Sequence, residues 1–200
     1  MNVIIDYGLG NLDSIKTAFE RLDIKVVISS DIEEIKKAKA VILPGVGAFR
    51  DAIKALKDSK LIPFIENHVS EGKYLLGICL GMQLLYEKSF ENGDYEGLGF
   101  IKGSIKKLDI PYKVPHMGWN KLKVNKQDNI LKYIKNEDFV YFVHSYYAVS
   151  SMEEVIAYSD YGVKIPAIVK YKNVYGMQFH PEKSSETGER LLKAFAEMIK

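Results

Sequence analysis

Three short segments of the sequence are apolar throughout, and each runs into a turn that contains glycine. They cover residues 3–5, 40–43 and 75–78, and helical spacing of apolar residues follows each turn. A strand that is apolar on both faces is typical of a parallel sheet with helices packed on each side. The alternation therefore predicts an α/β protein with a parallel central sheet.

The second half of the sequence has a different pattern, with short strands and few helices between residues 100 and 179. Strands are predicted at 139–143, 165–171 and 174–179, which indicates an antiparallel or mixed extension of the sheet in the C-terminal half. Helices are predicted from residue 12, over 49–69 with an interruption near Pro63, from about Met82, and over 187–199. Without a linker or a repeat, residues 1–200 are interpreted as one domain.

Composition excludes several classes of protein. The formal net charge of +2 and the absence of a Lys/Arg block argue against nucleic acid as a partner. The uncharged run at 74–86 is too short for a membrane span, and the N-terminus lacks a basic region of a secretory signal. We therefore expect a cytoplasmic protein without a membrane partner.

Cofactor and metal signals are also missing from the sequence. The turn at Gly8 and Gly10 begins like a dinucleotide fingerprint, but Asp13 stands where the third glycine belongs. One cysteine cannot form an intramolecular disulfide or a cysteine-rich metal site. We therefore expect neither a cofactor nor a metal, and the role of the single Cys79 becomes the central question.

Cys79 lies in the sequence Gly77-Ile78-Cys79-Leu80-Gly81, between an apolar strand and a predicted helix. A nucleophile between two glycines in this context indicates a nucleophile elbow, because glycine relieves the crowding of a sharp strand-to-helix turn. The amino end of the helix would favour a thiolate. The alternative is that Cys79 is a small buried apolar residue, as lone cysteines often are.

A base for this cysteine has to come from four histidines. His180 is the strongest candidate, because it ends an apolar strand and is followed by Pro181 and Glu182. A carboxylate two residues away can fix the imidazole tautomer and stabilise the imidazolium. His68 is predicted to lie on the surface of a helix. The alternative for His180 and Glu182 is an ordinary strand end exposed to solvent.

Acyl transfer also needs hydrogen-bond donors for an oxyanion, and backbone amides suffice. The turn Pro44-Gly45-Val46-Gly47 ends a predicted parallel strand, so the amides of Gly45, Val46 and Gly47 could join that of Leu80 near the sulfur. In isolation this turn would be an ordinary strand-to-helix connection.

Together these motifs resemble those of the class I (triad) glutamine amidotransferases, over essentially the whole chain. The motifs are Gly77-Ile78-Cys79-Leu80-Gly81-Met82-Gln83, His180-Pro181-Glu182 and Pro44-Gly45-Val46-Gly47. The resemblance implies a three-layer, flavodoxin-like fold and a Cys79, His180, Glu182 triad that releases ammonia from L-glutamine. It also implies that Gln83 and Glu91, with the backbone of Ser145 and Tyr146, bind the glutamine.

Within the family, one further segment indicates a partner. Pro115-His116-Met117-Gly118-Trp119-Asn120 is similar to members that deliver ammonia to a β/α-barrel cyclase subunit in histidine biosynthesis. For such members the resemblance implies a heterodimer and little glutaminase activity without the partner. The implied interface consists of Asn11, Met117, Gly118, Trp119, Asn120 and Lys183.

Three alternatives remain open from the sequence. The chain could be the glutaminase subunit of a different class I amidotransferase, or a stand-alone cysteine hydrolase of the same fold. It could also be a binding domain that has lost its chemistry, although Cys79, His180 and Glu182 are all present.

Overall fold

The computed structural model describes residues 1–199 of the chain. The first half contains β1 (Asn2–Ile5), α1 (Leu12–Glu20), β2 (Val26–Ser29), α2 (Ile32–Lys37), β3 (Ala40–Leu43), α3 (Phe49–Asp58), α4 (Ile62–Ser70), β4 (Tyr74–Ile78), α5 (Leu80–Leu84), β5 (Tyr86–Ser89) and β6 (Tyr95–Glu96). The second half contains β7 (Ile101–Lys107), β8 (His116–Lys121), β9 (Lys123–Val124), the 3-10 helix η1 (Asn129–Leu131), β10 (Phe139–His144), β11 (Tyr146–Val149), β12 (Val155–Asp160), β13 (Lys164–Tyr171), β14 (Val174–Met177), the 3-10 helix η2 (Pro181–Lys183) and α6 (Ser185–Met198).

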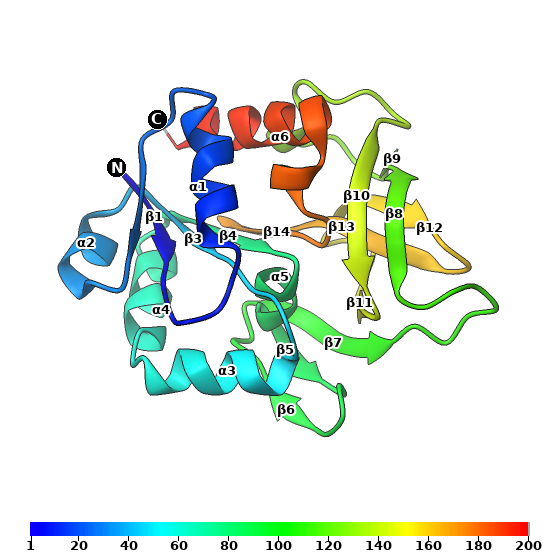
Figure 1. The fold of residues 1–200 in the computed structure, drawn as a ribbon, viewed down its shortest axis with the longest axis horizontal. Coiled ribbons are helices and arrows are strands. Elements are labelled where there is room, and N and C mark those ends of the chain that lie inside the picture. Colours follow the sequence, from blue (N-terminus) through cyan, green and yellow to red (C-terminus); the bar gives the residue numbers. More distant parts are fainter. Residues whose placement is uncertain (200) are drawn as a thin grey trace.

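An eight-stranded sheet forms the centre of the molecule, in the order β2-β1-β3-β4-β14-β13-β12-β9 (Figure 1). The five strands from β2 to β14 are parallel, and β13, β12 and β9 continue the sheet in antiparallel fashion. The predicted parallel sheet and its antiparallel extension are both confirmed.

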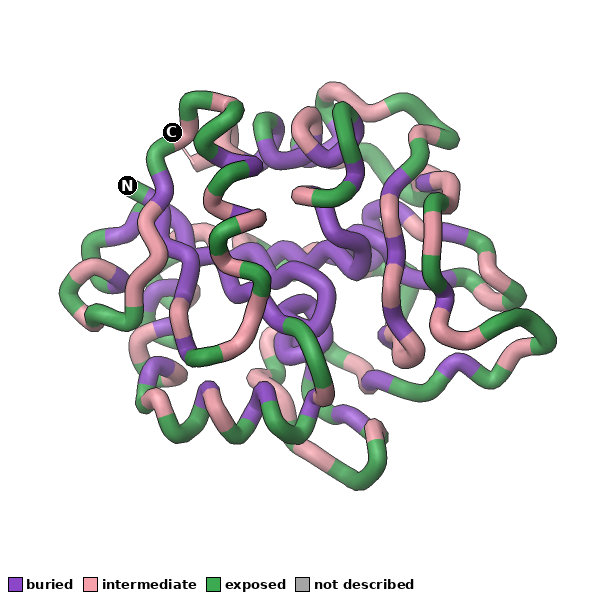
Figure 2. Tube along the Cα trace, viewed as in Figure 1, coloured by how far each residue is buried: buried purple, intermediate pink, exposed green. Residues whose placement is uncertain are grey.

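Helices cover both faces of this sheet, which gives the predicted three layers. Alternate residues of β3 enter two different cores: Ala40 and Ile42 enter the core under α1 and α6, while Val41 and Leu43 enter the core under α3 and α4. Figure 2 shows the buried chain concentrated in the central strands, between the helical layers. A strand with a core on each face has to be apolar throughout, which explains the sequence pattern.

The C-terminal half departs from the prediction in one respect, because its strands form two further sheets. β10 pairs with β8, and β11, β7, β5 and β6 form a four-stranded sheet. In β10 only alternate residues are buried, so one face packs onto the core while the other faces outward. The segment predicted at 139–143 is therefore a strand, but it lies outside the central sheet.

The helix after Cys79 begins at Leu80, slightly before the predicted start near Met82. The predicted interruption near Pro63 is confirmed, because α3 ends at Asp58 and Pro63 lies in the first turn of α4. Proline is tolerated there because the first N–H groups of a helix have no partner within it. His68 is buried rather than on the surface, and its Nε2 lies 3.1 Å from the carbonyl oxygen of Tyr74. Within residues 1–199, no helix combines the length and apolarity needed to cross a membrane.

The turn between β4 and α5 is possible only because two of its residues are glycine. A Cβ on Gly77 would lie 2.6 Å from the carbonyl oxygen of Gly81, and a Cβ on Gly81 would collide with the carbonyl oxygen of Leu43 in β3. The backbone at Gly81 therefore packs directly against the end of β3, with no side chain between them.

We expect Gly81→Ala to destabilise the protein by about 3 kcal/mol, because the methyl group has to displace backbone rather than a flexible side chain. Gly72→Ala is the matched control, since that site is open but has a φ of 80°, and it should cost only about 1 kcal/mol. Urea unfolding of both variants measures the difference. Equal losses of stability would contradict the proposed close contact.

Candidate active site

The predicted functional residues follow three neighbouring parallel strands. Cys79 follows β4, His180 is the third residue after β14, and the turn from Pro44 to Gly47 follows β3. Because these strands are adjacent and parallel, their carboxyl ends meet at one edge of the sheet. Ligand sites of doubly wound folds lie at this edge.

Cys79 has the strained backbone of a nucleophile elbow, with φ 54° and ψ −112°. Its amide donates to the carbonyl oxygen of Met177 in β14 at 2.7 Å, and helix α5 starts at the next residue. A non-glycine residue with positive φ is costly and is held in place only by its surroundings. Here the hydrogen bond to β14 and the two flanking glycines hold the cysteine.

His180 and Glu182 form a buried pair beside the cysteine. The Nδ1 atom of His180 lies 2.7 Å from Oε1 of Glu182, and the two side chains are 6% and 1% exposed. His180 and Cys79 line the same pocket, and the interaction between them raises the pKa of His180. Since Nδ1 is engaged by the carboxylate, Nε2 is the nitrogen left for the sulfur.

The backbone of His180 is fixed from both sides by Tyr141 in β10. The His180 amide donates to the Tyr141 carbonyl oxygen at 3.0 Å. The Tyr141 amide donates to the hydroxyl of Ser184, which in turn donates to the His180 carbonyl oxygen at 2.6 Å. Ser184 had no predicted role, although it stands two residues after the His180-Pro181-Glu182 motif.

The histidines near the site differ in charge. Burial lowers the pKa of His180, but the hydrogen bonds and charges of Cys79 and Glu182 outweigh it and raise that pKa to about 10. Burial is the main cause that lowers the pKa of His144 to about 3 and that of His116 to about 4. At pH 7 His180 is therefore protonated, whereas His144 and His116 are neutral.

A pocket of about 420 Å³ opens above Cys79 and His180 and includes most of the other predicted residues. Its lining includes Val46, Gly47, Leu80, Gln83, Glu91, Ser145 and Tyr146. Glu182 and Gly45 do not line it: Glu182 is buried against His180, and a Cβ on Gly45 would come within 2.7 Å of the Gly81 amide nitrogen. The volume suits a small polar molecule.

Polar side chains fix the floor of this pocket. Gln83 donates from Nε2 to the carbonyl oxygen of Tyr146 and to Oε1 of Gln178, at 3.0 Å each. Gln178 in turn has its Nε2 3.9 Å from the sulfur of Cys79. Gln178 had no predicted role, although it stands two residues before His180, directly after β14, where alternate residues of an extended chain point to the same side.

Glu91 reaches the pocket from the segment after β5. Its Oε2 accepts a hydrogen bond from the amide of Phe49, the first residue of α3, at 2.8 Å. One carboxylate oxygen thus anchors the side chain at a helix terminus. The carboxylate can still present negative charge to the pocket through its other oxygen.

The six predicted interface residues lie on segments that are neighbours in the fold. Met117 and Trp119 on β8 are 61% and 52% exposed, which is unusual for large apolar side chains. Asn11 precedes α1 and Lys183 lies in η2, and both are exposed. η2 contacts α1 and β10, and β10 pairs with β8, so these segments form a continuous surface (Figure 1).

Gly118 and Asn120 have different positions on that surface. Gly118 has a φ of 128°, a conformation suited to glycine. The Asn120 side chain bonds inward, since its Nδ2 donates to the carbonyl oxygen of Asp160 and its Oδ1 accepts from the Lys121 amide.

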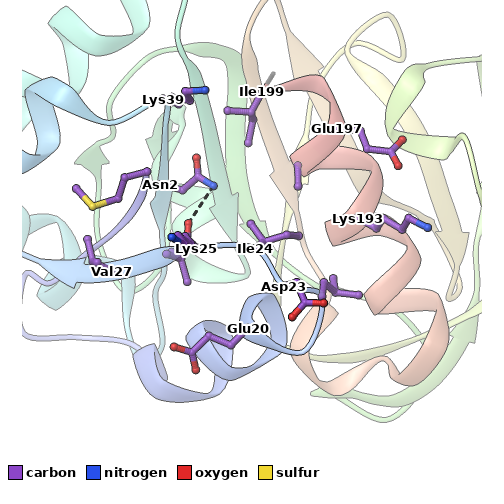
Figure 3. Close-up of a pocket in the computed structure, with 14 residues that line it drawn as sticks. Asn2, Glu20, Asp23, Ile24, Lys25, Val27, Lys39, Lys193, Glu197 and Ile199 are labelled. Carbon is purple, nitrogen blue, oxygen red and sulfur yellow. Dashed lines mark hydrogen bonds between the residues drawn. The ribbon is translucent and has the colours of Figure 1, made fainter.

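A larger cavity of about 1140 Å³ lies at the opposite, amino edge of the sheet. Figure 3 shows it between α6, which contributes Lys193 and Glu197, and the strand starts near Asn2 and Lys25. Its lining has neither cysteine nor histidine. Size alone would favour this cavity, whereas the edge of the sheet and the chemistry of the lining favour the pocket at Cys79 as the candidate active site. Among residues 1–199, no cluster of His, Cys, Asp or Glu has the composition of a metal site.

Comparison with known proteins agrees with this geometry. Residues 3–198 match the model of the family described as "Glutamine amidotransferase class-I". The chain is 52% identical over 202 residues to the imidazole glycerol phosphate synthase subunit HisH of Oceanobacillus iheyensis, with 100% of both chains covered. It is 53% identical over 198 residues to the protein of the same name from Lactococcus lactis subsp. lactis, with 98% of both covered.

Solved structures show the same fold at low identity. A crystal structure of a glutamine amidotransferase matches with a TM-score of 0.78 and 22% identity, covering 98% of both chains. A chain from the structure of PurLQS from Thermotoga maritima matches with a TM-score of 0.76 and 20% identity, covering 100% of this chain and 98% of that one.

The chain belongs to the class I glutamine amidotransferases, and it is an enzyme of that class. Within the class it falls in the group of imidazole glycerol phosphate synthase subunits named HisH.

The charge of His180 gives a testable prediction. Cys79→Ser keeps the size of the side chain but removes the sulfur, so Glu182 alone opposes burial and the pKa of His180 should fall below about 10. His116 and His144 should remain neutral at pH 7 in both proteins. A pH titration of the histidine ring signals by NMR measures all three, and an unchanged His180 pKa in the variant would contradict the coupling.

The same proton affects stability with a defined sign. Because the folded-state pKa of His180 is raised from 6.5, its contribution to stability is fully present below pH 6.5 and is lost as the pH rises to about 10. The stability advantage of the wild-type protein over Cys79→Ser should therefore shrink across that range.

Proposed function

We propose that this chain hydrolyses the side-chain amide of L-glutamine through Cys79, His180 and Glu182, and passes the ammonia to a cyclase subunit of imidazole glycerol phosphate synthase. The observation that carries the proposal is a strained cysteine that shares a pocket with a buried imidazole, itself 2.7 Å from a carboxylate. A nucleophile, a base and a group that orients the base are the parts that covalent amide hydrolysis needs.

The first step is attack of the Cys79 sulfur on the amide carbon of glutamine. The carbonyl electron pair moves to oxygen, and the resulting oxyanion needs nearby donors. The amide of Leu80 is suitable, because the first N–H groups of a helix have no intrahelical partner. The Val46–Gly47 peptide supplies the second donor after reorientation.

Such a reorientation is sterically inexpensive at Gly47. This residue has a φ of 92°, and nothing lies within 4 Å of the position its Cβ would occupy. Glycine at 45 and 47 removes the side-chain barrier on both sides of Val46. Binding of the partner would then control activity by fixing the Val46–Gly47 peptide in the orientation that donates to the oxyanion.

His180 supplies and removes protons in the two halves of the reaction. As imidazolium it protonates the departing nitrogen, so that the carbon–nitrogen bond breaks and ammonia leaves a glutamyl thioester on Cys79. The neutral imidazole then takes a proton from water, whose oxygen attacks the thioester and releases glutamate and the thiolate. Glu182 holds Nδ1 throughout and stabilises the charged ring.

The pocket lining suits the remaining groups of glutamine. The carboxylate of Glu91 complements the substrate's α-ammonium, and the backbone at Ser145 and Tyr146 borders the region for its α-carboxylate. Gln83 closes the floor next to Tyr146.

A partner subunit follows from the fate of the ammonia. In neutral water ammonia becomes ammonium, which is not a nucleophile, so a sealed route to an acceptor is needed. The relatives are named as subunits of imidazole glycerol phosphate synthase. For this chain we propose a heterodimer with the β/α-barrel cyclase, which forms imidazole glycerol phosphate and AICAR, a purine precursor, in histidine biosynthesis.

The cytoplasm is the compartment that we propose for this reaction. The nucleophile has to stay a free thiol, and reducing compartments preserve thiols. The names of the relatives favour this function over a stand-alone cysteine hydrolase or a different amidotransferase subunit.

We expect the purified chain to release little glutamate from glutamine alone and much more with the cyclase subunit and its nucleotide. Cys79→Ala should abolish turnover, and His180→Asn should reduce it at least about 100-fold through loss of general acid and base catalysis. Coupled detection of glutamate measures all cases. Full activity without the partner would contradict the coupled function, and activity in Cys79→Ala would contradict the mechanism.

The interface can be tested separately from the chemistry. Met117→Glu places a charge in the exposed apolar surface of β8 and should weaken binding of the cyclase subunit at least about tenfold. Tyr171→Glu is the control, because Tyr171 is also exposed but lies in β13, away from the proposed interface. Titration calorimetry measures both, and equal effects on affinity would contradict this choice of surface.

A further inference from the structure

Two buried histidines, His116 and His144, take no part in the chemistry described above. They are directly opposite each other in the β8–β10 pair and are 2% and 7% exposed. His116 Nδ1 lies 3.0 Å from His144 Nε2, and His144 Nδ1 lies 2.8 Å from the carbonyl oxygen of Tyr146. His116 Nε2 lies 3.3 Å from Nδ2 of Asn120.

These contacts allow only one arrangement of protons for two neutral rings. The Tyr146 carbonyl oxygen can only accept, so His144 donates from Nδ1 and its Nε2 is a bare acceptor. His116 then has to donate from Nδ1, which leaves its own Nε2 to accept from the Asn120 amide. The other contacts of Asn120 agree, because its Nδ2 also donates to the Asp160 carbonyl and its Oδ1 accepts from the Lys121 amide.

The chain of hydrogen bonds connects two different pockets. His116 and Asn120 line a surface pocket of about 430 Å³ together with Met117 and Trp119. His144 and Tyr146 line the pocket of Cys79. The Tyr146 carbonyl also accepts from Gln83, which bonds Gln178 next to the sulfur.

We infer that His116 and His144 are positioning residues that fix the Tyr146 carbonyl, and with it Gln83, from the side of the surface pocket. This inference rests on the proposed function for the identity of the substrate, since the carbonyl borders the glutamine site. We call this chain of hydrogen bonds the histidine relay. Each group donates to the next in one direction, from Asn120 to His116, from His116 to His144 and from His144 to the Tyr146 carbonyl oxygen.

Packing holds the relay in register. The His116 ring stacks between Phe142 and Tyr161, with centroid distances of 4.6 and 4.0 Å and interplanar angles of 22° and 19°. A ring held on both faces can turn little, so its two nitrogens stay directed at His144 and Asn120. A change in the hydrogen bonds of Asn120 therefore alters the hydrogen bonds at the Tyr146 carbonyl oxygen, and it does so without movement of the backbone.

The first test measures tautomers in the wild-type chain alone, labelled with ¹⁵N at histidine, without glutamine or partner. Long-range ¹H–¹⁵N correlation spectra should show both His116 and His144 with a protonated Nδ1 and a bare Nε2. An Nε2–H tautomer or an imidazolium in either ring would overturn the relay. This result does not depend on activity, so it separates failure of the relay from failure of the proposed function.

The second test compares two substitutions at His116, assayed with the partner subunit present. His116→Asn places an amide donor where Nδ1 stood and should keep KM for glutamine within about twofold of wild type. His116→Phe keeps the aromatic stack but has no donor, and KM should rise about fivefold or more, with a smaller change in kcat. Equal KM values in the two variants would show a packing role only and would overturn the inference.

The variants also need a check of folding. If His116→Phe unfolds, His116→Gln replaces it. This variant keeps an oxygen that can accept from Asn120 but has no donor directed at His144. The expected rise in KM is the same, and a wild-type KM would overturn the relay.

Discussion

The site depends on a close approach of the turn at Cys79 to the end of strand β3. Gly81 leaves no room for a side chain against the Leu43 carbonyl, and Gly45 leaves none against the Gly81 amide. The cysteine amide also bonds to Met177 in β14. The proposed nucleophile Cys79, the turn at 44–47 and the proposed base His180 are therefore fixed relative to one another by backbone contacts between three adjacent parallel strands. A side chain at Gly45 or Gly81 would push the turn at Cys79 away from the end of β3.

The second constraint is that His180, the proposed base, is held by hydrogen bonds from β10, a strand outside the central sheet. Tyr141 of β10 binds the His180 amide directly and its carbonyl through Ser184. The ring of Tyr141 packs edge-on against Trp119, which is half exposed on the neighbouring strand β8. The surface that we propose for the partner is thus only one residue from the backbone that holds the base. This short connection gives a physical route for activation by a partner.

Much of the fold could be predicted from the sequence because a strand with a core on each face has to be apolar throughout. The glycines around Cys79 and the His180, Glu182 spacing likewise reflect local sterics and local hydrogen bonding. Other features depend on pairing between distant segments, which local patterns do not determine. The separate β8–β10 sheet, the buried His68 and the Gln83–Gln178 contact are of this kind. Gly45 is another example, because its place in the motif did not show that it packs against the Gly81 backbone rather than lining the pocket.

We propose above all that the glutamyl group of glutamine becomes covalently attached to the sulfur of Cys79 as ammonia leaves. The direct measurement is an acid quench of the chain with the cyclase subunit and its nucleotide during turnover of radiolabelled glutamine, followed by peptide mapping. We predict a label on the peptide that contains Cys79, lost on treatment with hydroxylamine as expected for a thioester. Glutamate formation with no label on that peptide, or with a label on a different residue, would contradict the account.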